Sequence, residues 1–91
     1  MDTEWSVETT PSAQRERDEL PDAIREEVLD AVLELSDDPF PSDSIELAGH
    51  GDFRRIKAYR SQYCIVYRIS ATQGKVIIWR VRPRATAYHG F

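Results

Sequence analysis

The sequence predicts an α+β fold: a short N-terminal strand, a hairpin of two helices, and then a twisted antiparallel meander of three strands. Between residues 11 and 35 the apolar side chains recur at helical spacing, whereas residues 53–82 contain three runs of β-branched and aromatic residues. A chain of 91 residues has room for one hydrophobic core, so residues 1–91 are expected to form a single domain.

The first half of the chain carries the signals for the strand and both helices. Residues 4–9 alternate between apolar and polar side chains, which predicts a half-buried strand. Thr10 is a favourable N-cap, and Pro11 is a favourable first residue for a short, charged helix. A second helix is predicted from Pro21 to Leu35, where apolar residues recur at spacings of three and four.

Two loops precede and interrupt the strands of the second half. Residues 36–44 contain two prolines and residues 48–52 contain two glycines, so both segments are predicted to be loops. Strands are expected at residues 53–59, 63–69 and 75–82, with a hairpin turn around residues 72–74.

The alternation of side chains along these strands assigns the two faces of the sheet. Tyr67 and Trp79 fall on the face that is predicted to pack against the helices. The opposite face then presents five cations, which are Arg55, Lys57, Arg68, Arg80 and Arg82. A single β-bulge would exchange the faces of a strand, so this assignment depends on regular strands.

The formal net charge of −4 conceals a strong asymmetry between the halves of the chain. Residues 1–52 hold all 16 acidic residues and three arginines, a net charge of −13, whereas residues 53–91 hold nine cations and no acid. Such asymmetry indicates an anionic partner, and arginine, whose planar fork suits phosphate, is the commoner cation here. We therefore predict that residues 53–91 bind a polyanion.

Composition argues against several other classes of function. His50, Cys64 and His89 are scattered without the spacing of metal ligands, so neither a metal nor another cofactor is expected. Cys64 is the single cysteine, which excludes an internal disulfide. The sequence has no apolar run of the roughly 18–20 residues that a membrane span needs, and its acidic N-terminus does not resemble a secretory signal, so a cytoplasmic location is expected.

If the polyanion is RNA, cleavage through the ribose 2′-hydroxyl would need a base, an acid and positive charge on the phosphate. Residues 53–91 hold no carboxylate, which leaves Lys57, Tyr88 and His89 as the candidate proton carriers. Because Tyr88 lies outside the predicted strands, a functional role is favoured for it over a role in core packing. His50 is expected to be solvated, and Glu46 is a weak candidate base.

Several short motifs, in their order and spacing, resemble the RelE/ParE superfamily of toxins from type II toxin–antitoxin systems. The front half matches through its strand, its short helix and a second helix that closes before Asp38-Pro39. The remaining motifs are Leu47-Ala48-Gly49, Phe53-Arg54-Arg55-Ile56-Lys57, Tyr63-Cys64-Ile65-Val66-Tyr67-Arg68-Ile69, Arg82-Pro83-Arg84 and Tyr88.

The resemblance implies a toxin that a cognate antitoxin neutralises, with a heterotetramer of the two as one possible assembly. Members of the RelE branch are ribosome-dependent mRNA endonucleases, and members of the ParE branch inhibit DNA gyrase instead. On the RelE pattern, which the cationic face favours, the partners are the ribosome and mRNA. A catalytically degenerate binding module of the same fold is a third alternative.

The resemblance also implies roles for individual residues. The implied catalytic set is Arg55, Lys57, Arg82, Tyr88 and His89. The predicted phosphate-binding set is Arg60, Arg68, Arg80 and Arg84, of which the resemblance implies Arg84, whereas Arg68 and Arg80 come from the predicted cationic face. One position departs from the pattern, because Cys64 stands where the family usually has an arginine that supports the phosphate chemistry. On this interpretation Arg60 or Arg68 is expected to replace that charge.

Overall fold

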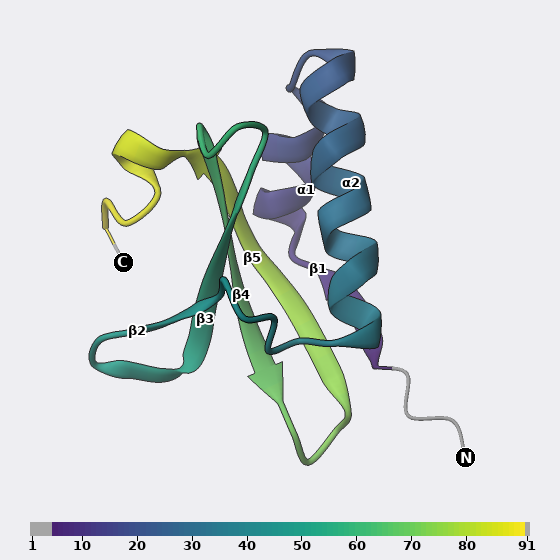
Figure 1. Cartoon of the computed structure of the whole chain (residues 1–91), viewed down its shortest axis with the longest axis vertical. Coiled ribbons are helices and arrows are strands. Elements are labelled where there is room, and N and C mark those ends of the chain that lie inside the picture. The colour runs from purple at the N-terminus through teal and green to yellow at the C-terminus, as the bar shows by residue number, and fades with distance from the viewer. Residues whose placement is uncertain (1–4, 91) are drawn as a thin grey trace.

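The computed structural model describes residues 5–90 and has two layers, with both helices on one face of a single sheet (Figure 1). The elements in chain order are β1 (Ser6–Thr9), α1 (Pro11–Asp18), α2 (Asp22–Asp37), β2 (Ile45–Leu47), β3 (His50–Ala58), β4 (Tyr63–Ser70), β5 (Lys75–Pro83) and a 3₁₀ turn (Arg84–Thr86). The predicted α+β class, both helices and the three long strands are confirmed.

The sheet is larger than the predicted meander. It has five strands in the order β1-β5-β4-β3-β2. β1 lies parallel to β5 at one edge, and β2, which was not predicted, pairs antiparallel with β3 at the other. β3 begins at His50, so part of the predicted loop at residues 48–52 is strand. Glu4, the first residue of the predicted N-terminal strand, lies outside the described residues.

The helix start at Thr10 has the predicted geometry. The Thr10 hydroxyl accepts a hydrogen bond from the Ala13 amide at 3.2 Å, and Pro11 follows as the first helical residue. The Thr10 amide also donates to the Ile78 carbonyl at 3.0 Å, directly after the last paired residue of β1. This junction fixes the start of α1 against β5.

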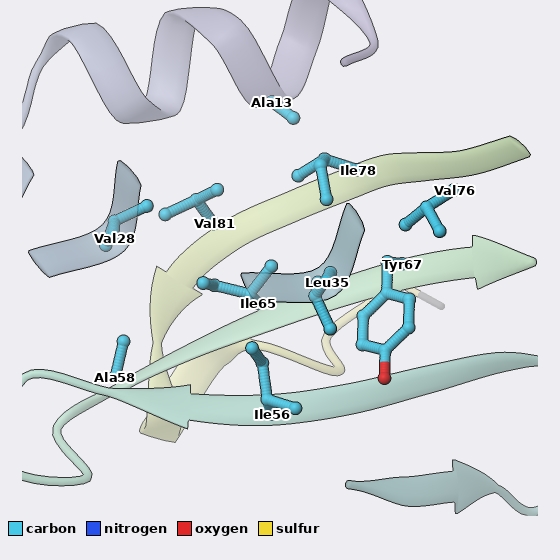
Figure 2. Close-up of a cluster of buried hydrophobic side chains, with 10 residues drawn as sticks. All are labelled: Ala13, Val28, Leu35, Ile56, Ala58, Ile65, Tyr67, Val76, Ile78 and Val81. Carbon is cyan, nitrogen blue, oxygen red and sulfur yellow. The ribbon is translucent and has the colours of Figure 1, made fainter. Parts of the chain in front are cut away.

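The core lies between the helices and the sheet (Figure 2). α2 contributes Val28 and Leu35, which are buried, and they pack in one cluster with Ile56, Ile65 and Ile78 of the three long strands. Tyr67 is fully buried in the same cluster, as predicted, and its hydroxyl donates to the Pro39 carbonyl at 2.8 Å. That hydrogen bond ties the loop after α2 to the sheet.

The predicted burial of Trp79 is wrong because β5 contains a bulge. Across β4 and β5, Tyr67 pairs with Ile78 but Val66 pairs with Arg80, so Trp79 is an extra residue on β5. The helix-facing residues of β5 are therefore Val76, Ile78 and Val81, and Trp79 is 38% exposed. The bulge leaves Arg80 opposite Val66, on the sheet face away from the helices.

The turn between β3 and β4 is conformationally strained. Tyr59, Arg60 and Ser61 all have positive φ angles of 50°, 57° and 65°, a region that side chains with a Cβ rarely occupy. The turn is closed by a hydrogen bond from the Gln62 amide to the Tyr59 carbonyl at 3.0 Å. Three consecutive left-handed residues hold Arg60 at the tip of this hairpin, at one end of the sheet.

We expect Ser61→Gly to raise the free energy of unfolding by roughly 0.5–1 kcal/mol, because glycine has no Cβ to clash at positive φ and this outweighs its larger unfolded-state entropy. Urea unfolding followed by circular dichroism measures the change. Ser42→Gly, at an exposed position of the loop before β2, is the matched control and should be neutral or destabilising. Equal effects of the two substitutions would contradict the strain argument.

Candidate nucleic-acid interface

The strand register gathers the predicted cations on the sheet face that the helices do not cover. Cross-strand partners share a face, and Lys57, Cys64 and Arg82 form one row across β3, β4 and β5. Arg55, Val66 and Arg80 form the next row on this face, and Arg68 lies two residues beyond Val66 on β4. We call the surface formed by Arg55, Lys57, Arg68, Arg80 and Arg82 the cationic face.

The C-terminal segment folds back over this same side of the sheet (Figure 1). One Arg80 Nη atom donates to the carbonyl of Ala87 at 3.0 Å and to the carbonyl of His89 at 2.8 Å. Ala87 is fully buried, which anchors the segment between these two contacts. Arg80, predicted to bind phosphate, thus holds Tyr88 in place through the backbone on either side of it.

Tyr88 lies where the two cationic rows meet. Its hydroxyl is close to the side chains of Cys64 and Arg55, one from each row. Burial raises the pKa of the Tyr88 phenol, the neighbouring Cys64 thiol raises it further, and Arg55 partly offsets both. The phenol therefore keeps its proton at neutral pH, and 43% of the residue remains exposed. Tyr88 is placed to donate a proton to a group bound on the cationic face.

Cys64 is fully buried beside Tyr88. A long arginine side chain at this position would compete for the space that Tyr88 occupies. Arg68, one of the two expected replacements, lies 3.6 Å from Asp52, and both side chains are partly exposed. Arg60, the other, lies in the strained turn at the end of the sheet. Neither lies in the row of Cys64, so neither supplies its charge at that position.

The structure adds one residue that sequence analysis missed. Glu16 of α1 accepts a hydrogen bond from Arg82 Nε at 2.6 Å and another from the backbone amide of Val81 at 2.9 Å. A carboxylate therefore reaches the edge of the cationic face and fixes the guanidinium of Arg82. The available sequence signal was weak: Glu16 lies three residues after Ala13 and four before Leu20, on the helix side that faces the sheet.

We expect Glu16→Ala to lower the free energy of unfolding by roughly 1–2 kcal/mol, because the Val81 amide and the Arg82 guanidinium lose a charged acceptor. This loss is at the low end of the range for a hydrogen bond to a charged group, because both charged side chains are about a quarter exposed, at 30% for Arg82 and 24% for Glu16. Thermal unfolding measures it, with Glu26→Ala on the exposed side of α2 as the control. Equal stability of the two variants would contradict a structural role for Glu16.

Two open hollows lie at the β3–β4 end of the sheet. One, of about 520 Å³, is lined in part by Arg55, Lys57 and Arg60. The other, of about 360 Å³, is lined in part by Arg60 and Arg84. Arg60 is shared by both, so the predicted phosphate-binding residues Arg60 and Arg84 extend the cationic face around the end of the sheet.

The remaining candidate proton carriers are less well placed. His89 is exposed, and the contacts that fix it are made by its carbonyl, which accepts from Arg80 at 2.8 Å and from Arg82 at 3.5 Å. Glu46 is exposed and pairs with Arg54 in the β2–β3 ladder, not with the cationic face. His50 and Tyr88 both line a hollow of about 350 Å³.

The described residues were also compared with the requirements of a metal site and of a membrane-spanning helix. Within residues 5–90, no group of three or more His, Cys, Asp or Glu side chains is arranged to hold a metal ion. No helix in the same range is long and apolar enough to cross a membrane.

Comparison with known proteins identifies one family. The family model described as "ParE toxin of type II toxin-antitoxin system, parDE" matches residues 7–88. No curated protein matches the chain.

Solved structures share the fold. A chain in the RelBE2 toxin–antitoxin complex from Mycobacterium tuberculosis is 28% identical, with a TM-score of 0.75 over 89% of this chain and 99% of that one. The isolated RelE toxin from E. coli is 23% identical, with a TM-score of 0.78 over 87% and 83%. A chain in the RelE–RelB complex from Pyrococcus horikoshii is 24% identical, with a TM-score of 0.73 over 91% and 98%.

Proposed function

The chain belongs to the family of ParE toxins of type II toxin–antitoxin systems, within the RelE/ParE superfamily. We propose that, of the two activities found in this superfamily, it has that of the RelE branch and is a ribosome-dependent mRNA endonuclease. The observation that carries the proposal is the position of Tyr88, a protonated phenol held next to Cys64 and Arg55 on the cationic face. Gyrase inhibition needs a binding surface only. A proton donor fixed beside a cluster of cations is the arrangement that phosphoryl transfer uses.

The proposed reaction needs no cofactor. The ribose 2′-oxygen forms a bond to the adjacent phosphorus while its proton passes to a base, for which Lys57 is the candidate. The bond from phosphorus to the 5′-oxygen breaks, and Tyr88 gives its proton to that oxygen. The products are a 2′,3′-cyclic phosphate and a free 5′-hydroxyl, and Arg55, Arg82 and the newly formed Lys57 ammonium stabilise the charge on the phosphorane.

An antitoxin is the expected protein partner. Solved structures of similar fold include toxin–antitoxin complexes such as RelBE2 from Mycobacterium tuberculosis and RelE–RelB from Pyrococcus horikoshii. By analogy we propose that a cognate antitoxin neutralises this chain, with a heterotetramer of two toxins and two antitoxins as one assembly to test. Co-expression with a neighbouring gene product, followed by mass measurement of the purified complex, determines the stoichiometry.

Induction of the protein in a bacterial host, followed by mapping of mRNA 5′ ends, tests the activity. The proposal predicts new ends within translated codons, and fewer of them when translation initiation is blocked beforehand. Growth arrest with intact transcripts would be incompatible with an mRNA endonuclease.

A second function is favoured by two observations. The matching family model is described as ParE, and Cys64 removes a cation from the row that contains Lys57 and Arg82. Members of the ParE branch act on DNA gyrase, so this chain is a candidate gyrase inhibitor. Accumulation of gyrase–DNA cleavage complexes after induction, together with full toxicity of Tyr88→Phe, would support that function over RNA cleavage.

The charges on the cationic face predict a moderate salt dependence of RNA binding. Five cations, each binding one phosphate, would give a log–log slope of about −3.5 for single-stranded RNA, at roughly 0.7 per phosphate. Glu16 pairs with Arg82 and Asp52 lies beside Arg68, so five cations and two carboxylates leave three net charges. We therefore expect a slope of about −2, measured by fluorescence anisotropy between 50 and 300 mM salt. A flat response would contradict electrostatic binding.

A further inference from the structure

Three aromatic rings form a ladder on the sheet face that carries the cations. The rings of His50 and Phe53 have centroids 6.3 Å apart and meet at 86°. The rings of Phe53 and Trp79 have centroids 5.3 Å apart and also meet at 86°. We call His50, Phe53 and Trp79 the aromatic ladder. Each edge-to-face contact fixes the orientation of the next ring.

The ladder runs across the strands directly beside the cationic rows. Phe53 of β3 pairs with Arg68 of β4, two pairs away from, and on the same face as, the row of Arg55, Val66 and Arg80. Trp79 reaches Phe53 from β5 because it follows Ile78, which faces the helices, and therefore points to the opposite face. At the other end, His50 shares a hollow of about 350 Å³ with Tyr88. The ladder therefore extends from the neighbourhood of Tyr88 to β5.

Trp79 stays 38% exposed although Phe53 supports it from the side. A rigid, partly exposed indole next to a cationic surface matches the general mode of single-stranded nucleic acid binding, in which cations follow the phosphates and aromatic rings stack on bases. The bulge at Trp79 then places Arg80, the next residue, on the same face as the indole, so that a cation and an aromatic ring follow each other on one surface.

We propose that the aromatic ladder is a stacking subsite for an unpaired nucleobase of the RNA strand that the cationic face holds. The inference rests on the proposed RNA function. It deepens that function because it adds recognition of a base to a surface that is otherwise expected to bind only phosphates. Stacking uses the π face that every base has, so the subsite favours larger purines without selecting one sequence.

The test compares two probes of equal charge with the full-length protein. One is an eight-residue oligoadenylate with 2′-O-methyl riboses, which cannot be cleaved for want of a free 2′-hydroxyl, and the other is an abasic 2′-O-methyl oligomer of the same length. We expect the adenine probe to bind about tenfold more tightly, as one stacked base provides, and to quench indole fluorescence. Trp79→Ala should remove both the preference and the quenching, and Trp79→Phe should keep part of the preference.

Trp5→Phe is the matched control. Trp5 packs edge-to-face against Phe40, with ring centroids 6.5 Å apart, and Phe40 in turn lies under the Arg54 guanidinium. Trp5→Phe should leave the preference for the adenine probe unchanged. Circular dichroism of each variant establishes that the fold is intact.

The possible outcomes separate this inference from the function on which it rests. Equal affinity for both probes, with normal salt dependence, overturns the stacking subsite and leaves the cationic face intact. Failure of both probes to bind overturns the RNA function and the subsite together. If Trp79→Ala leaves the adenine preference unchanged but abolishes binding of the cognate antitoxin, the ladder is a protein contact and the subsite is overturned.

Discussion

Lys57→Ala is expected to lower the rate of mRNA cleavage by about 100-fold or more and to leave the fold intact. Lys57 is exposed, shares a row with Arg82 and borders the hollow that Arg55 also lines, so its amine can reach a bound phosphate. In the proposed reaction it accepts the 2′-hydroxyl proton and then stabilises the phosphorane as an ammonium. Loss of one such group typically costs a factor of 10² to 10³ in rate.

Lys75→Ala is the matched control for Lys57→Ala. Lys75 is also a lysine of the sheet, but it begins β5 and its amine lies 2.8 Å from the Glu8 carboxylate. Primer extension on ribosome-bound mRNA compares the two variants, and thermal unfolding checks their stability. A folded Lys57→Ala protein with the cleavage rate of Lys75→Ala would remove Lys57 from the reaction.

Arg82→Ala should also abolish toxicity, but it is a less specific probe. Arg82 is bound by Glu16 at 2.6 Å, so its removal takes a cation away from that carboxylate, which still accepts from the Val81 amide. The less compensated negative charge would then repel phosphate in addition to the loss of the cation. Arg82→Ala is therefore best compared with an Arg82→Ala, Glu16→Gln double variant, which separates the two effects.

Tyr88→Phe should reduce the cleavage rate by about 100-fold with little change in stability, because it removes one hydroxyl from a partly exposed ring. The pH dependence follows from the raised pKa of the phenol, whose first cause is burial. Since the acid form donates the proton, the contribution of Tyr88 should be complete at neutral pH. It should be lost only as pH rises above the ordinary tyrosine value of about 10.

Cleavage rates of the wild type and Tyr88→Phe, measured from pH 6 to pH 9, check this assignment. Their ratio should stay constant across the range, because the phenol is protonated throughout. A ratio that falls toward one as pH rises to 9 would mean that the pKa of the Tyr88 phenol is lowered, which would contradict the structure. A ratio near one at every pH would exclude Tyr88 as the acid.

The sequence determined the secondary structure and the two sheet faces well, because both depend on local periodicity. Its main error, the burial of Trp79, came from the bulge that pairs Val66 with Arg80. A bulge depends on which residue of the neighbouring strand lies opposite, and alternation within one strand does not contain that information.

The composition of the site was harder to predict. The positions of the cations on the three long strands follow from the alternation of side chains along each strand. Glu16 does not, because its contact with Arg82 joins residues that are 66 positions apart in the chain. The same holds for Arg80, whose contacts with the carbonyls of Ala87 and His89 fold the C-terminal segment over the sheet. These contacts depend on tertiary packing, and they decide which cations remain available to a phosphate.

The central claim is that the cationic face and Tyr88 together cut mRNA on the ribosome, and the chemistry of the cut end tests it most directly. Purified ribosomes are programmed with a defined mRNA, incubated with the full-length protein, and the new 3′ ends are analysed by mass spectrometry. We predict 2′,3′-cyclic phosphate ends that appear with the wild type and are about 100-fold slower with Tyr88→Phe. Intact mRNA in the presence of folded wild-type protein, or ends that form equally fast with Tyr88→Phe, would contradict the claim.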